Sequence, residues 1–154
     1  MSFLFQKVGR SRAEIFKILK NAESSAIGPG NAVCYDYTTA ADGLAVILPT
    51  TAMLNMFAGL VADGTTLAAS GSDGQYGKVL VHGHHAAARW YGTSTPQGTP
   101  LVPVNATGAM AVGATHVTSI NTANSEIQFA YTGESSTHVT SLSSTAKVAF
   151  VRAL

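Results

Sequence analysis

Beyond residue 30, the apolar positions of this chain come in short runs that are separated by glycine-containing turns. Runs of this kind, rich in β-branched and aromatic residues and bounded by turn residues, predict β-strands. The expected strands cover residues 31–37, 43–48, 56–62, 76–82, 86–91, 99–104, 114–120, 126–132, 137–142 and 146–152. Short strands at this spacing favour an all-β fold, either a small β-barrel or a β-sandwich of jelly-roll type.

The N-terminal region has a different pattern, in which apolar residues recur at the helical period. One helix face would hold Ile15, Phe16, Ile18, Leu19 and Ala22. Ser11 and Glu14 have the spacing of a capping box, in which each side chain accepts a hydrogen bond from an otherwise unpaired backbone N–H. We therefore expect one short amphipathic helix over about residues 12–23. A helix of this length is marginal alone and needs a surface to dock on, either its own β body or a partner.

A Gly-Pro-Gly sequence at residues 28–30 resembles a hinge, so we expect an N-terminal arm of residues 1–27 and a β-rich body of residues 28–154. The arm is basic, because most of the Lys and Arg side chains lie within it. Only 11% of the whole chain is charged, against about 25% in ordinary domains. Either neighbouring subunits cover much of the surface, or the chain is a neutral β protein from a crowded or extracellular setting.

An apolar and cationic arm on a weakly charged body predicts a protein that grips a large partner surface. The cations would pair with acidic groups and add association rate and register more than affinity. The expected contact residues are Phe3, Leu4, Phe5, Lys7, Arg10, Arg12, Ile15, Phe16, Lys17, Ile18, Leu19 and Lys20. A net charge of +1 does not steer the whole protein to nucleic acid, and no apolar run has the length that a membrane-spanning helix needs. We expect neither nucleic acid nor membrane as a partner.

Histidines gather at His82, His84 and His85 within or just after an expected strand. His82 and His84 would point to the same face, which is the geometry of two imidazoles that share a zinc ion. A zinc site needs further ligands, and no zinc-binding motif accompanies the pair, so we expect no metal. We interpret the group as an interface or a pH-sensitive cluster, because protonation of imidazoles could loosen a contact between subunits.

Residues that would support catalysis do not form a recognisable set. Residues 71–78 look like a phosphate-binding loop but lack the required residue order, so a hairpin loop is expected. Cys34 is the only cysteine, and its apolar neighbours indicate a buried thiol. Trp90, beside Arg89 and Tyr91, could form a sugar-stacking platform, or it could anchor the core or a subunit contact. The sequence therefore predicts no enzyme and no cofactor.

The body contains five short stretches whose sequences are distinctive when they are taken together. They are a glycine-flanked strand at 31–37, Phe-Ala-Gly-Leu-Val-Ala-Asp at 57–63, Gly-Lys-Val-Leu-Val-His-Gly at 77–83, Gly-Thr-Pro-Leu-Val-Pro at 98–103 and Thr-Gly-Ala-Met at 107–110. In this style the stretch from residue 28 to about residue 112 resembles the β-rich capsid decoration (cement) proteins of tailed bacteriophages. The N-terminal arm and a repeat at 115–120 and 137–142 lie outside the resemblance.

The resemblance implies a virion structural protein without catalytic residues. It would bind the outer surface of an icosahedral head, after synthesis in the host cytoplasm, and clamp neighbouring major capsid protein subunits. Its partners would be the major capsid protein and neighbouring copies of itself, as a homo-oligomer such as a dimer or trimer. The alternatives are a carbohydrate- or receptor-binding β module on a virion and, in a third class, a small hydrolase or metal enzyme on a β-barrel.

Overall fold

The computed structural model describes residues 4–8, 13–38, 42–91, 95–112, 130–133 and 147–153, with the backbone alone at 4–8, 91 and 147. Within these ranges the chain forms strands and turns and no helix. The strands are β1 (Leu4–Val8), β2 (Ala13–Asn21), β3 (Ala32–Tyr35), β4 (Ala45–Ile47), β5 (Phe57–Val61), β6 (Tyr76–Ala88), β7 (Trp90–Tyr91), β8 (Pro100–Pro103), β9 (Met110–Val112), β10 (Ala130–Thr132) and β11 (Lys147–Arg152). The all-β class is confirmed.

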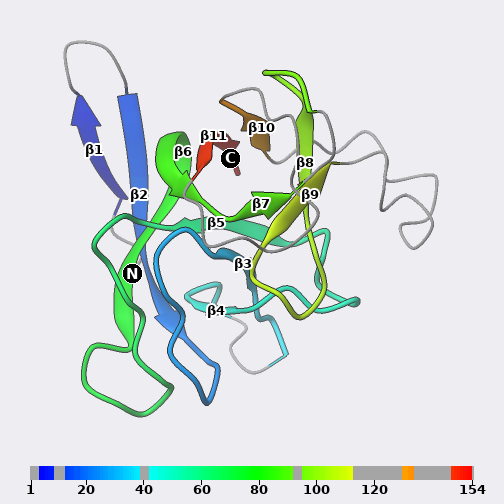
Figure 1. Ribbon diagram of the computed structural model, residues 1–154. Coiled ribbons are helices and arrows are strands. Elements are labelled where there is room, and N and C mark those ends of the chain that lie inside the picture. Colours follow the sequence, from blue (N-terminus) through cyan, green and yellow to red (C-terminus); the bar gives the residue numbers. More distant parts are fainter. Residues whose placement is uncertain are drawn as a thin grey trace.

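All the described strands belong to one sheet, in the order β1-β2-β4-β3-β5-β6-β11-β10-β8-β9-β7 (Figure 1). An additional pairing joins β2 to β6, so that β2, β4, β3, β5 and β6 follow one another in a ring. The remaining strands continue from β6 and leave the sheet as a whole open. The sheet is therefore partly ring-like and not a barrel, so of the two predicted forms, barrel or sandwich, the barrel is wrong.

The N-terminal segment that was expected to be a helix is a strand over Ala13–Asn21. Strand β2 runs antiparallel to β6 along one edge. Its other edge pairs first with β1 and then, in parallel, with β4. β-Branched and aromatic residues favour this extended form, and hydrogen bonds to three strands outweigh the marginal stability of an isolated helix. Residues 11 and 12, which include the first half of the expected capping box, lie outside the described residues.

The long strand β6 is the centre of the fold, because it pairs with β2, β5 and β11. Its neighbouring residues Val79 and Leu80 are both buried but pack into two different apolar clusters. Leu60 and Val61 of β5 divide between the same two clusters. Successive side chains of a strand point to opposite faces, so the central part of the sheet has a core on each side. Because both faces of these strands are buried, their residues form continuous apolar runs in the sequence.

Most other expected strands of the body are present where described, with somewhat different ends, and the segment at 49–56 forms turns. Residues 76–82 and 86–91 were expected as two strands, but residues 76–88 form the single strand β6, which the short β7 follows. Strand β9 was not expected. The expected strands at 114–120 and 137–142, and with them the repeated sequence, lie outside the described residues. Strand β2, from the expected arm, is an inner strand of the same sheet as the described strands of the expected body. In the described part of the chain, no helix has the length and apolar character to cross a membrane.

Candidate functional site

A cleft of about 360 Å³ lies beside the pairing of β2 with β6, and we call it the β2–β6 cleft. Its lining combines apolar side chains with acidic, basic and imidazole groups. The lining residues are Glu14, Phe16, Ala62, Asp63, Lys78, Leu80, His84 and His85. They come from β2, from the turn that follows β5, and from β6. Small-molecule and side-chain pockets commonly combine apolar walls with a few polar groups in this way, so the cleft is the candidate site.

Two backbone features bring Glu14 to the cleft. The register between β2 and β6 shifts between Ile15 and Phe16, which marks a bulge. Gly83 of β6 has a φ of 122° and lies against β2, where an added Cβ would be 2.8 Å from the carbonyl oxygen of Ala13 and 3.0 Å from Glu14 Cα. Only glycine accommodates both the φ angle and the close approach. The glycine therefore allows the two strands to meet at the position of Glu14.

The turn after β5 brings Asp63 to the other side of the cleft. Ala62 N donates a 3.0 Å hydrogen bond to the carbonyl oxygen of Lys78, which holds the end of β5 against β6. Thr65 N then donates a 3.1 Å bond to the carbonyl oxygen of Ala62 and closes the turn. The Asp63 side chain is 54% exposed, so its carboxylate is at the mouth of the cleft and accessible to a ligand.

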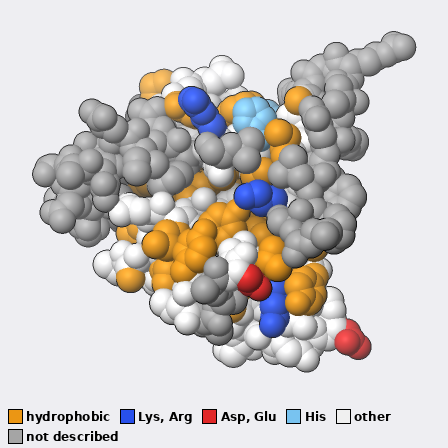
Figure 2. Space-filling model, turned by 180° about the vertical axis from the view of Figure 1, so that it is seen from behind, with side chains coloured by type: hydrophobic (Ala, Val, Ile, Leu, Met, Phe, Trp, Pro, Cys, Tyr) orange, Lys and Arg blue, Asp and Glu red, His pale blue; other side chains and the backbone are white. Residues whose placement is uncertain are grey.

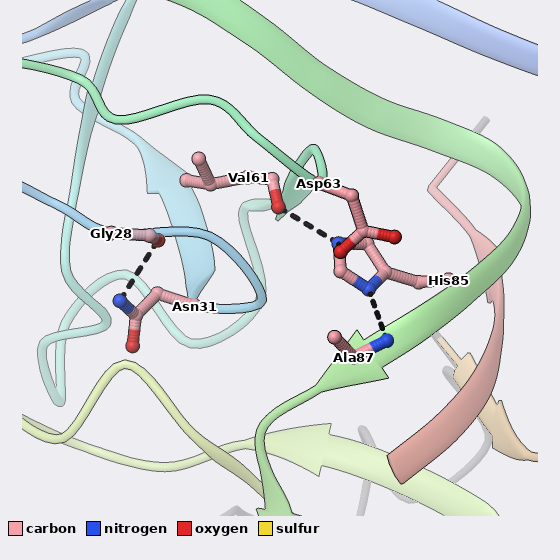
Figure 3. A network of polar contacts seen from close by, with 6 residues as sticks. All are labelled: Gly28, Asn31, Val61, Asp63, His85 and Ala87. Atoms are coloured by element: carbon pink, nitrogen blue, oxygen red, sulfur yellow. Dashed lines mark hydrogen bonds and ion pairs between the residues drawn. The ribbon is translucent and has the colours of Figure 1, made fainter. Parts of the chain in front are cut away.

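His85 is the buried polar group of the site, with 2% exposure (Figure 3). Its Nε2 atom is 2.9 Å from the carbonyl oxygen of Val61, and its Nδ1 atom accepts a 3.1 Å hydrogen bond from Ala87 N. An acceptor at Nδ1 and a donor at Nε2 describe the neutral ring with its proton on Nε2. The Asp63 Oδ1 atom lies 3.6 Å from Nε2 and faces the ring, but the two nitrogens are already used within the fold.

The three histidines of the sequence cluster have different surroundings. His82 is half-buried and meets Phe150 edge to face, with ring centroids 5.2 Å apart. His84 lines the β2–β6 cleft, and His85 is buried beside it. No group of three His, Cys, Asp or Glu side chains in the described ranges is placed to hold a metal ion.

The residues expected to anchor a partner divide into three groups. Ile15, Phe16, Lys17, Ile18 and Lys20 are half-buried in β2. Leu19 is fully buried in the core among Val46, Val61 and Val79, so it is not available to a partner while the protein is folded. The remaining positions lie outside the described residues or have a described backbone only, namely Phe3, Leu4, Phe5, Lys7, Arg10 and Arg12.

Lys17 already has an intramolecular contact. Its Nζ atom donates a 2.9 Å hydrogen bond to the hydroxyl of Tyr35 and lies 5.4 Å from the centre of that ring. Tyr35 in turn packs against Tyr37, with ring centroids 5.8 Å apart. A lysine that binds a partner's carboxylate would first have to give up these contacts.

Two further residues behave as buried structural groups. Trp90 is 3% exposed and packs in the core with Leu101 and Met110, so the sugar-stacking platform is wrong and the core anchor is confirmed. Cys34 is fully buried in β3, and burial raises the pKa of its thiol to about 12. It remains a protonated thiol and has no nucleophilic character near neutral pH.

Sequence reasoning singled out His84, His85 and Phe16 as site residues, but it gave Glu14 only a capping role and did not select Asp63 or Lys78. Glu14, Asp63 and Lys78 come from three separate segments, and no local motif joins them. Comparison of the chain with protein-family models, with curated proteins and with solved structures finds no match.

Proposed function

We propose that this protein is a virion structural protein of the decoration (cement) type. It binds the outer surface of an icosahedral phage head, clamps neighbouring major capsid protein subunits and carries no catalytic activity. The resemblance of residues 28–112 to such proteins supports the proposal, as does the small, weakly charged all-β body. Copies of the chain would associate as a dimer or trimer at junctions of the shell.

The observation that carries the proposal is the set of large apolar side chains on the surface. Tyr37, Met56, Tyr76 and Phe150 are 47%, 40%, 56% and 38% exposed. Figure 2 shows hydrophobic side chains across the middle of one face, with Lys or Arg and Asp or Glu groups among and beside them. Exposed large apolar side chains of this kind are candidates for contact with another protein.

The proposed way of binding the capsid differs from the one expected for a helical N-terminal arm. Strand β2 is an inner strand, so it cannot leave the sheet to extend over a neighbouring subunit. Strand β1 comes first in the strand order and pairs with β2 alone among the described strands. We propose that the β1–β2 hairpin contacts the capsid while it remains part of the sheet, and that the exposed aromatic residues add further contacts. Several modest contacts of this kind give high avidity together.

The experiment is co-sedimentation with heads of the phage that encodes the chain, prepared without it. The double variant Tyr76→Ser, Phe150→Ser removes two exposed aromatic contacts, and Gln97→Ser is a matched control at an exposed turn. Deletion of residues 1–8 tests β1 without removing β2. We expect the control to bind fully, and the double variant and the deletion to bind at least about tenfold more weakly, as loss of interface hot spots does. Full binding by both would refute the proposed contact surface, and no binding by the parent protein would refute the function.

The alternative, a carbohydrate- or receptor-binding module on a virion, has one favourable observation. The Tyr35–Tyr37 pair leaves an aromatic ring exposed on the surface, where a sugar could stack. A glycan array distinguishes the two functions. Binding to one class of glycan that is lost in Tyr37→Ala would favour the module, whereas binding that strictly requires capsid favours the decoration protein.

A further inference from the structure

We propose that the β2–β6 cleft binds a basic side chain, a guanidinium or ammonium group on an apolar stem, that a partner protein presents. The inference goes beyond the proposed function, because the cleft has the same chemistry whichever protein carries the basic group. It rests on the charges, the apolar wall and the size of the cleft.

Carboxylates outnumber ammonium groups in the cleft lining. Glu14 and Asp63 contribute two carboxylates and Lys78 one ammonium group, and His84 adds an imidazole. The residue of β1 that pairs with Glu14 is Lys7, of which only the backbone is described. His85 adds no positive charge, because both ring nitrogens are used by backbone groups and the ring is neutral. Within the described residues, neither carboxylate forms an ion pair with Lys78. A concave site in which carboxylates outnumber ammonium groups favours cations over anions.

The apolar wall fits the stem of a basic side chain. Leu80 and Ala62 are buried beneath the cleft, at 1% and 5% exposure, and Phe16 is half-buried beside them. Lys and Arg side chains pack their methylene stems on apolar surface and keep the charged end near polar groups. The Phe16 ring could add a cation–π contact. Carboxylates at the mouth and apolar groups within match this division of a basic side chain.

The size of the cleft favours one side chain over a large ligand. Its volume of about 360 Å³ is near the lower end of the range of about 300–1,000 Å³ for ligand sites. An anionic ligand is a poorer match, because a single ammonium group faces two carboxylates. A metal ion is also a poorer match, since the described His and acidic side chains do not converge as a ligand set.

The test is a titration of the isotopically labelled full chain followed by NMR. Agmatine, an aliphatic stem with a guanidinium group at one end and an ammonium group at the other, is the dicationic probe, and N-acetylglutamate is its dianionic counterpart. We expect agmatine to shift the amide signals of Leu80, Asp63 and His85, and its binding to weaken as salt is added. N-acetylglutamate should leave these signals unchanged.

Charge variants give the sharper result, because two opposite effects are expected. Glu14→Gln and Asp63→Asn should each weaken agmatine binding about threefold to fivefold, whereas Lys78→Met should strengthen it by a similar factor. Asp73→Asn, at an exposed turn outside the cleft lining, is the matched control and should change nothing. The substituted cleft side chains are partly or fully exposed, so the variants should fold, and their amide spectra verify this.

Three results would overturn the inference. They are the absence of agmatine shifts at the cleft in the parent protein, tighter binding of N-acetylglutamate than of agmatine, and weaker agmatine binding by Lys78→Met. Capsid co-sedimentation is a separate measurement, so failure of this inference and failure of the proposed function are distinguishable.

Discussion

The Nε2 atom of His85 lies 2.9 Å from the carbonyl oxygen of Val61 and joins the curved part of β6 to the end of β5. The same oxygen also accepts a 2.9 Å hydrogen bond from Gly30 N, so Val61 would keep a partner without the imidazole. Ala87 N depends more on the ring, because it donates to Nδ1 at a position where β6 and β11 change register. His85 therefore has a structural role beside the cleft.

Replacement of His85 by leucine should destabilise the protein by about 1–3 kcal/mol. Leucine fills a similar space but leaves the Ala87 N–H without its acceptor and removes one bond to Val61. His82→Leu is the control, since it loses mainly the ring contact with Phe150 and should cost less than about 1 kcal/mol. Urea denaturation of both variants checks the difference, and equal losses would show that the buried hydrogen bonds are unimportant.

Gly59 should tolerate no side chain, because β5 passes very close to β6 there. An added Cβ would lie 2.2 Å from the carbonyl oxygen of Leu80 and 2.9 Å from Val79 Cγ1, at a φ of 139°. We expect Gly59→Ala to lower the free energy of unfolding by about 3–5 kcal/mol, through backbone displacement as well as strain. Gly64→Ala separates the two causes. Its φ is 69° with no heavy atom within 4 Å, so only strain of about 1 kcal/mol is expected. Similar denaturation midpoints for the two variants would contradict the steric explanation.

Asn21 is fully buried, and its side chain satisfies several backbone groups at once. Nδ2 donates to the carbonyl oxygens of Ser25 and Ala68 at 2.8 and 2.9 Å, and Oδ1 accepts from Glu23 N at 2.8 Å. Asn21→Asp has nearly the same shape but places a carboxylate against carbonyl oxygens, which should cost about 3–5 kcal/mol at neutral pH. The exposed Asn55→Asp should change stability by less than about 0.5 kcal/mol. Thermal unfolding measures both, and a stable Asn21→Asp protein would show that the site relaxes or admits water.

Strand positions in the body could be predicted because local patterns determine them. The run at β5 is apolar at every position, and its burial on both faces explains why no alternation was needed. The N-terminal segment was misassigned because Ile15, Phe16, Ile18 and Leu19 satisfy the helical period and also suit a strand that is covered on both sides. Only the pairing with β1, β4 and β6 decides between the two, and pairing is not a local property.

The candidate site could be predicted only in part. The run of histidines indicated a site on β6. The residues that contact the rings of His82 and His85, such as Phe150 and Val61, are distant in sequence. Asp63 had the signature of a turn residue, and its position beside His85 depends on the pairing of β5 with β6. Glu14 reaches the cleft through a bulge and the close approach of Gly83, which no sequence pattern reveals. The cleft is thus a product of strand register and not of a motif.

The thiol of Cys34 should make the protein sensitive to alkaline pH. Burial raises its pKa from about 9 to about 12, so the unfolded chain releases the thiol proton at lower pH than the folded protein does. The stabilising contribution is fully present below about pH 9 and is lost as pH rises toward 12, by about 1.4 kcal/mol per pH unit. Cys34→Ala should be less stable at neutral pH, because the substitution leaves a small cavity, but should lack this slope. Free energies of unfolding measured from about pH 8 to 11 under reducing conditions check the prediction, since tyrosines and lysines contribute equally to both proteins. Parallel pH profiles would mean that the thiol ionises as readily in the folded protein as in the unfolded chain.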